Sequence, residues 1–256
     1  MPGLTKTTIP WATAVWNPVT GCTPAGDGCL NCYAKRMAET RLAGRAGYPP
    51  MPDSFRPTVH PDRIFSPMRS RKPQRIFVDS MGDLFHDTVP SRDIVRIFDV
   101  MRRAHRHKFI ILTKRPERTR EFVTTALVKE LCFYRLPNVA LGVSVWNQHS
   151  ADRFAPVLRN TLAVCRIISA EPLLGPVTLD LTGISWVMCG GETGPGARPC
   201  HAEWIYDVSR QCAEAGVPYF WKQWGAVSDT HVHALGNLYA ERREYPAAMF
   251  LPGERP

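Results

Sequence analysis

The sequence predicts an α/β fold, specifically a partial, open parallel β/α barrel that is TIM-barrel-like and has about six to seven strands. Short, continuous apolar runs alternate with segments of helical periodicity, which is typical of parallel strands buried on both faces. Polar residues follow most of these runs, where a parallel sheet assembles its functional site. The chain has 256 residues, of which 44% are hydrophobic, so one large core can be filled.

The elements are expected in the following order. A first strand within residues 11–19 leads into a loop that contains cysteines, and a helix follows over residues 30–43. Residues 47–73 are rich in proline and lack periodicity, so they are expected to form an irregular surface insertion. Later apolar runs predict strands at 76–80, 109–114, 139–144, 165–171, 185–190 and 217–222. Helical periodicity predicts helices at 92–106, 116–130, 152–160 and 201–215. Residues 1–226 are expected to form one domain, and residues 227–256 a loosely ordered tail.

The formal net charge is +9, which favours a polyanionic partner such as nucleic acid. Basic surfaces are also common in proteins that bind no nucleic acid, so the charge alone does not decide. The densest basic run predicts a nucleic-acid-binding face formed by Arg102, Arg103, Arg106 and Lys108. No apolar run is long enough to span a bilayer and no secretory signal is evident at residues 1–10, so a cytoplasmic protein without membrane contact is expected.

Cysteines are concentrated in one short stretch, where Cys22, Cys29 and Cys32 have the spacing C-x6-C-x2-C. Thiolates are soft ligands that suit zinc and iron–sulfur clusters. A structural zinc site needs a fourth ligand, usually from a second close Cys or His pair, and none follows here. The spacing therefore favours a [4Fe-4S] cluster held by three cysteines, with inert thiols as the alternative.

The stretch resembles that of radical S-adenosylmethionine enzymes, in particular the branch that contains spore photoproduct lyase, whose members carry G-C…G-C-x-x-C-Y-A. The chain also resembles a phage- and prophage-associated family over roughly residues 8–226. The shared patterns are W-N-P-x-T-G-C (16–22), D-S-M-G-D-L-F (79–85), L-T-K-R-P (112–116), G-V-S-V (142–145), S-x-E-P-L (169–173), G-G-E-x-G (190–194) and F-x-K-Q-W-G (220–225).

The resemblance implies that Cys22, Cys29 and Cys32 hold a [4Fe-4S] cluster. Its open iron would bind S-adenosylmethionine, and one electron from a flavodoxin- or ferredoxin-like donor would release a 5′-deoxyadenosyl radical. The expected substrate is nucleic acid or a nucleotide, in the host cytoplasm if a phage encodes the protein. Two features depart from the common pattern. The first cysteine interval is longer than in C-x3-C-x2-C, and Asp83 stands near the place of the usual G-G-E, where it is expected to accept the cofactor's ammonium group.

The resemblance also suggests roles for polar and glycine residues at the strand ends. The residues expected to contact the cofactor are Ser80, Gly82, Asp83, Lys114, Ser144, Glu171, Gly190, Gly191 and Glu192. The catalytic candidates are Lys114, Lys222 and His86. Arg198 is expected to offer a cation to an anionic group. Lysines at strand ends are also often simply solvated, and strand-terminal polar groups also cap helices.

Two other functions remain open from the sequence. One is a non-catalytic, metal- or cluster-binding phage protein that binds nucleic acid through its basic surface. The other is a zinc-dependent nucleobase enzyme, which ranks lower because no H-x-E precedes the cysteine pair.

Overall fold

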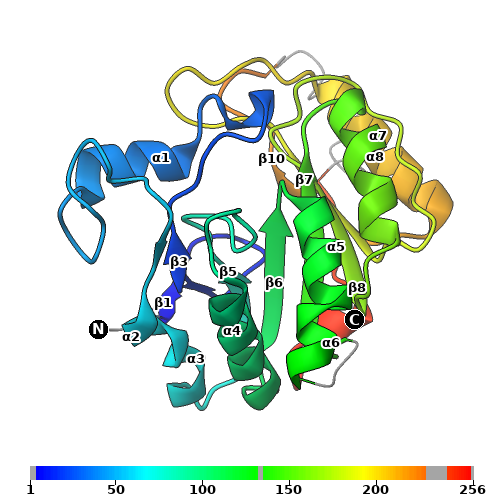
Figure 1. Cartoon of the computed structure of the whole chain (residues 1–256). Coiled ribbons are helices and arrows are strands. Elements are labelled where there is room, and N and C mark those ends of the chain that lie inside the picture. The colour runs from blue at the N-terminus through cyan, green and yellow to red at the C-terminus, as the bar shows by residue number, and fades with distance from the viewer. Residues whose placement is uncertain (1–3, 132–134, 229–240, 255–256) are drawn as a thin grey trace.

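A computed structural model describes residues 4–131, 135–228 and 241–254, and its centre is one eight-stranded sheet (Figure 1). Seven neighbouring strands run parallel in chain order, and β1 pairs with β2 antiparallel at one edge. The sheet is not closed, because β1 and β10 lie at opposite ends of the strand order. The strands are β1 (Leu4–Lys6), β2 (Ala14–Trp16), β5 (Arg75–Val78), β6 (Lys108–Thr113), β7 (Val139–Val145), β8 (Cys165–Ala170), β9 (Trp186–Gly190) and β10 (Tyr219–Gln223). The predicted α/β class is confirmed.

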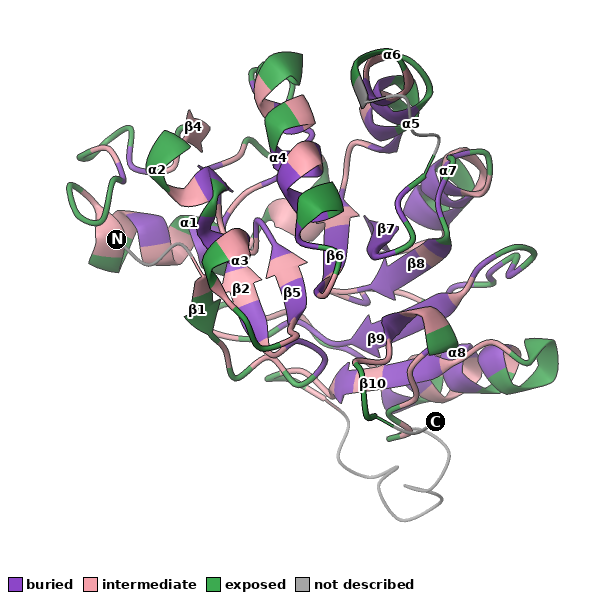
Figure 2. Cartoon of the chain, turned by 90° about the horizontal axis from the view of Figure 1, so that it is seen from below, coloured by how far each residue is buried: buried purple, intermediate pink, exposed green. Residues whose placement is uncertain are grey.

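Helices cover the outer face of the curved sheet, as Figure 2 shows from below. Their buried residues form two apolar layers with the strands, one under α4 and α5 and one under α7 and α8. Asn147 caps α7 by accepting a hydrogen bond from the Ser150 amide at 3.0 Å. None of the described helices has both the length and the apolar character required to cross a membrane. The helices are α4 (Ser91–Arg103), α5 (Pro116–Thr124), α6 (Ala126–Leu131), α7 (Gln148–Arg159) and α8 (Ala202–Ala215).

The inner face of the sheet is filled by a third apolar cluster, to which Trp11, Trp186 and Met249 contribute. Met249 is fully buried, and the Arg75 guanidinium lies 2.8 Å from a Glu254 carboxylate oxygen. The prediction of a loosely ordered tail is therefore wrong for residues 241–254, which plug the amino-terminal side of the sheet. They do so through single buried side chains and through backbone hydrogen bonds with β10, neither of which leaves a periodic pattern in the sequence. Residues 229–240 lie outside the described part of the chain.

The segment around the cysteines differs from its prediction in detail. The first strand divides into β2 and β3 (Val19–Thr20), and β3 pairs antiparallel with β4 (Thr58–Val59). The expected helix at 30–43 begins only with α1 (Tyr33–Met37) and continues as a turn of π-helix, η2 (Ala38–Leu42), while a 3-10 turn, η1 (Asp27–Cys29), precedes it. Residues 47–73 hold only β4 and two helical turns, α2 (Pro61–Ile64) and α3 (Ser66–Arg69).

Candidate functional site

The cysteine loop, defined as residues 21–32, lies across the edge of the sheet where the parallel strands end. Its first residue is fixed to the loop after β5, because the Gly21 amide donates to the Met81 carbonyl at 2.8 Å and Gly21 forms a bridge with Gly82. Gly21 has a φ of 81°, and a Cβ there would lie 2.3 Å from the Arg56 carbonyl oxygen. Only glycine fits position 21. Gly82, which is predicted to contact the cofactor, instead lies against the backbone of Gly21.

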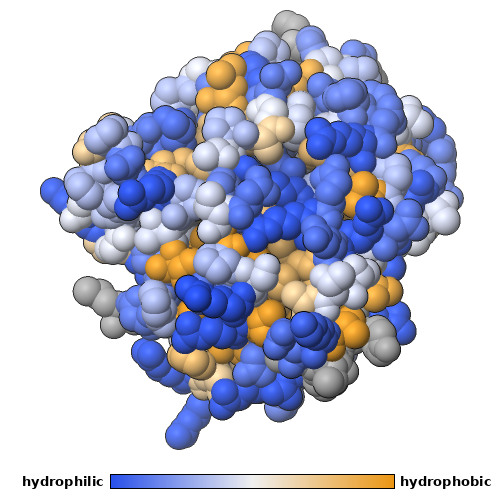
Figure 3. Space-filling view, in the orientation of Figure 1, coloured by the Kyte–Doolittle hydropathy of each residue, from blue (hydrophilic) through white to orange (hydrophobic). Residues whose placement is uncertain are grey.

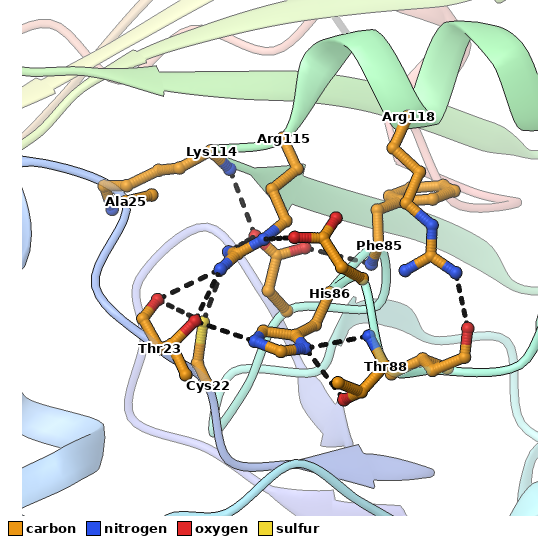
Figure 4. Close-up of polar contacts among 12 residues, drawn as sticks. Cys22, Thr23, Ala25, Phe85, His86, Thr88, Lys114, Arg115 and Arg118 are labelled. Carbon is orange, nitrogen blue, oxygen red and sulfur yellow. Dashed lines mark hydrogen bonds and ion pairs between the residues drawn. The ribbon is translucent and has the colours of Figure 1, made fainter.

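The first cysteine is held by an arginine that follows β6 (Figure 4). Nη1 of Arg115 lies 3.4 Å from the Cys22 sulfur, and its Nη2 donates to the Thr23 carbonyl and hydroxyl at 3.1 and 3.0 Å. Burial and the nearby Asp83 carboxylate raise the pKa of Cys22 to about 11, and Arg115 limits this rise by favouring the thiolate. Arg115 therefore supplies the positive charge that a thiolate at position 22 needs.

Asp83 is engaged by donors of this chain on both carboxylate oxygens. Its Oδ1 accepts from the Thr113 hydroxyl at 2.8 Å and the Phe85 amide at 3.0 Å, and its Oδ2 accepts from the Lys114 amide at 3.2 Å. Oδ2 also lies 3.4 Å from Nη1 of Arg115. The side chain is buried. Asp83 therefore orients Arg115 toward the cysteine loop.

His86 supports the same end of the loop through a neutral ring. The Thr88 amide donates to Nδ1 at 3.2 Å, so the proton is assigned to Nε2, which donates to the Thr23 hydroxyl at 2.8 Å. Burial and the nearby Arg115 lower the pKa of His86, which favours this neutral form. Both ring nitrogens are thus engaged within the chain.

The middle of the loop rests on a tryptophan that follows β7. A Cβ added at Gly26 or at Gly28 would lie 2.5 or 2.8 Å from ring atoms of Trp146. The indole is itself fixed, because it is buried and makes an edge-on contact with Phe154 at 5.7 Å between ring centroids. Nothing in the sequence spacing connected Trp146 with the cysteines.

The second half of the loop is bound by the carboxylate that follows β9. Oε1 of Glu192 lies 2.6 Å from Nη2 of Arg198, and Oε2 accepts from Nε and the amide of Arg198 at 2.9 and 2.8 Å. Oε2 also accepts from the Asn31 side chain at 2.9 Å, and Nη1 of Arg198 donates to the Asp27 carbonyl at 2.9 Å. These hydrogen bonds hold the pKa of Glu192 at about 2. The expectation that Arg198 offers its charge to an external anion is wrong here, because Glu192 occupies its guanidinium.

The neighbouring glycines serve close packing. A Cβ at Gly190 would lie 2.9 Å from Nε2 of Gln223, and one at Gly191 would lie 2.2 Å from the Trp224 carbonyl oxygen. Glycine at both positions therefore lets the end of β9 and the residue after it pack closely against the end of β10 and the residue after it.

A buried lysine and a half-buried glutamate form the third polar group at this edge. Nζ of Lys222 donates to the Ser169 hydroxyl at 2.9 Å and lies 2.5 Å from Oε2 of Glu171. Oε1 of Glu171 accepts from Gln223 at 2.5 Å. Nζ of Lys222 also lies 5.3 Å from the centre of the Trp11 ring. The ammonium group is thus paired, while about a third (32%) of the Glu171 side chain stays exposed.

The remaining predicted cofactor contacts lie nearby with different partners. Ser80 receives a hydrogen bond from the Tyr33 hydroxyl on its carbonyl, and its own hydroxyl donates to Asn17 at 3.1 Å. Ser144 is buried within β7. Lys114 contributes its backbone amide to Asp83.

The predicted nucleic-acid-binding run is not brought to the cysteine loop. Its residues end α4 and begin β6, so they lie at the amino-terminal edge of the parallel sheet, opposite the loop. Arg106 donates to two backbone carbonyls at 2.8 and 2.9 Å, and Arg102 and Arg103 form ion pairs with Asp99. Lys108 starts β6 and is half-buried. Arg106 therefore links the segment before β6 to the end of α3, through the carbonyls of Met68 and Ser70.

The donor chemistry of the loop fits a cluster with three thiolate ligands. Cys22, Cys29 and Cys32 are all partly exposed and free. The nearby Asp83 and His86, which are the natural candidates for a fourth zinc ligand, are engaged in hydrogen bonds of their own. In the described ranges, no group of three or more His, Cys, Asp or Glu side chains is already gathered as a metal site. Apart from the Asp27 carboxylate, the metal-binding side chains of the loop are the three soft thiols, which suit an iron–sulfur cluster.

Comparison with known proteins places the chain in one family. The family described as "Protein of unknown function (DUF5131)" matches residues 6–246, which is nearly the whole chain. No curated protein and no solved structure matches the sequence. The chain belongs to the DUF5131 family.

Proposed function

We propose that this protein is a radical S-adenosylmethionine enzyme built on a partial, open barrel of the TIM-barrel type, with a [4Fe-4S] cluster on its cysteine loop. One observation carries the proposal. All three cysteines lie on a single loop that crosses the carboxyl-terminal edge of the parallel strands and is held near both of its ends. Sheets of parallel β/α units place their active sites at this edge.

Within this proposal, Cys22, Cys29 and Cys32 are the cluster ligands. The bound cluster would supply the electron that cleaves S-adenosylmethionine to methionine and a 5′-deoxyadenosyl radical. Arg115 stabilises the charge of the Cys22 thiolate, and Asp83 keeps the guanidinium in place. Glu171 has an exposed part and can accept hydrogen bonds from cofactor hydroxyl groups, while Lys222 and Gln223 hold its carboxylate in place.

The proposed substrate is nucleic acid or a nucleotide, and the net charge of +9 supports this class. The exposed cations that follow the cysteine loop most closely in sequence are Lys35 on α1, Arg41 in η2 and Arg45 on the turn after η2. The face drawn in Figure 3, on which both α1 and α4 lie, is mostly hydrophilic with scattered apolar patches. We propose the surface that carries Lys35, Arg41 and Arg45 as the substrate face, in place of residues 102–108. The electron is proposed to come from a flavodoxin- or ferredoxin-like donor in the cytoplasm.

The proposal is tested by anaerobic turnover. Reconstituted protein, dithionite and S-adenosylmethionine are incubated with single-stranded DNA, duplex DNA or RNA, and 5′-deoxyadenosine and the oligonucleotide mass are measured. Deoxyadenosine that increases with one nucleic acid, and that is absent from the Cys29→Ala variant, is expected. Cys165→Ala, which alters a buried thiol on β8, is the matched control and should retain the activity. A wild-type cluster that never cleaves the cofactor would instead favour the non-catalytic nucleic-acid-binding protein.

A further inference from the structure

We infer that Glu192 is a positioning residue for the second half of the cysteine loop and sets the geometry of Cys29 and Cys32 through Arg198 and Asn31. The assignment of the two cysteines as cluster ligands rests on the proposed function. The restraint of the loop does not, because it follows from contacts between residues of this chain.

Glu192 reaches the loop on both sides of Cys29. Its Oε2 accepts from the Asn31 side chain, which immediately precedes Cys32, and Asn31 also donates to the Gly196 carbonyl at 2.6 Å. Through Arg198 it reaches the Asp27 carbonyl, two residues before Cys29. One carboxylate therefore fixes the backbone before the second cysteine and the side chain before the third.

The strength of this link follows from its geometry and its burial. Arg198 binds both oxygens of Glu192 with its planar guanidinium, and its backbone amide adds a third hydrogen bond. Paired arginine and carboxylate groups of this kind form the strong class of hydrogen bonds. The Glu192 side chain is only 6% exposed, so water does not replace a lost partner. A neutral amide at position 192 leaves Arg198 without this counterion and offers one acceptor oxygen where Arg198 and Asn31 used two.

The first cysteine is held independently. Cys22 is bound by Arg115, which follows β6 and is oriented by Asp83. A change at Glu192 therefore affects Cys29 and Cys32 and leaves Cys22 in place. This difference between cysteines of one loop separates a positioning role from general destabilisation, which would affect all three.

The test is the rate of alkylation of each cysteine by iodoacetamide in the reduced, metal-free full-length protein, followed by peptide mass spectrometry. We expect Glu192→Gln to accelerate modification of Cys29 and Cys32 roughly tenfold, which corresponds to about 1.4 kcal/mol of lost restraint. Cys22 should change less than about twofold. Glu214→Gln is the matched control, since it removes a glutamate from an exposed pair with Arg210 and should change none of the rates.

A second variant keeps the test decisive if Glu192→Gln does not fold. Asn31→Ala cuts the contact on the loop side, leaves the Glu192–Arg198 pair intact, and should accelerate Cys32. Equal acceleration of all three loop cysteines, or no acceleration of Cys29 and Cys32, would overturn the inference. If wild-type protein binds no iron and the selective acceleration still occurs, the proposed function fails while the positioning role stands. If iron binds, Glu192→Gln should lose it faster to a chelator.

Discussion

Replacing Gly28 with alanine tests whether the cysteine loop is seated on Trp146. A Cβ at this position would lie 2.8 Å from Cδ2 and Cε3 of the indole, whereas ordinary contact begins at 3.4 Å. The ring or the loop must therefore give way by about 0.6 Å, the difference between the two distances. The backbone of Gly28 is not in the left-handed region, so the cost is steric.

The cost is expected to exceed the usual benefit of alanine. Trp146 is 6% exposed and packs on Phe154, so its ring has little room to move. Overpacking of this kind costs about 1–3 kcal/mol, while replacing glycine by alanine returns about 0.4–1 kcal/mol through the unfolded state. We expect Gly28→Ala to lower the free energy of unfolding by about 1–2 kcal/mol net, measured by urea denaturation.

Two further variants make the measurement specific. Gly175→Ala is the matched control, because a Cβ there would meet nothing within 4 Å, and it should leave the stability unchanged or slightly higher. Combining Gly28→Ala with Trp146→Leu should cost less than the sum of the two single changes, because the smaller side chain removes the clash. A Gly28→Ala protein as stable as Gly175→Ala would refute the seating of the loop.

Three more outcomes are expected. Arg198 holds the pKa of Glu192 near 2, against an ordinary value of 4.5, so its contribution is present above about pH 5 and is lost as the pH falls toward 2. Wild type should be at most about 3 kcal/mol more stable than Glu192→Gln at pH 7 in urea denaturation, and the gap should narrow by about 1.4 kcal/mol at pH 3.5; a constant gap would contradict the pairing. Arg75→Gln should lower stability by about 2 kcal/mol, because it breaks the partly buried links to Met249 and Glu254 of the C-terminal segment, and an unchanged melting temperature would show that these links are dispensable. Apparent affinity for DNA should fall steeply as salt rises, whereas an affinity independent of salt would exclude phosphate contacts as its source.

The fold was accessible from the sequence where burial on both faces leaves a continuous apolar run. β7 is buried at all seven of its positions, and its run from Val139 predicts the strand within two residues. By contrast, β1 has three residues, two of them exposed, and depends on pairing with β2 at the sheet edge. Met249 belongs to the core through tertiary contacts alone. Local patterns carry no information about such contacts.

The candidate site was only partly accessible, for a related reason. The spacing of the three cysteines is a local signal, and so is the strand-end position of Asp83. Trp146 and Glu192 approach the loop from segments more than a hundred residues away, and their roles depend on which strands are neighbours. The basic run at 102–108 shows the converse, since charge density in a sequence does not reveal which edge of a sheet it occupies. Its position at the end of α4 places it opposite the cysteine loop.

The central claim is that the cysteine loop holds a [4Fe-4S] cluster, and its most direct test is metal analysis after anaerobic reconstitution. We expect about four irons and four sulfides per chain, and a reduced-state electron paramagnetic resonance signal that shifts when S-adenosylmethionine is added. A variant with Cys22, Cys29 and Cys32 all changed to alanine should bind neither. Zinc in place of iron, or iron that is retained by the triple variant, would contradict the claim.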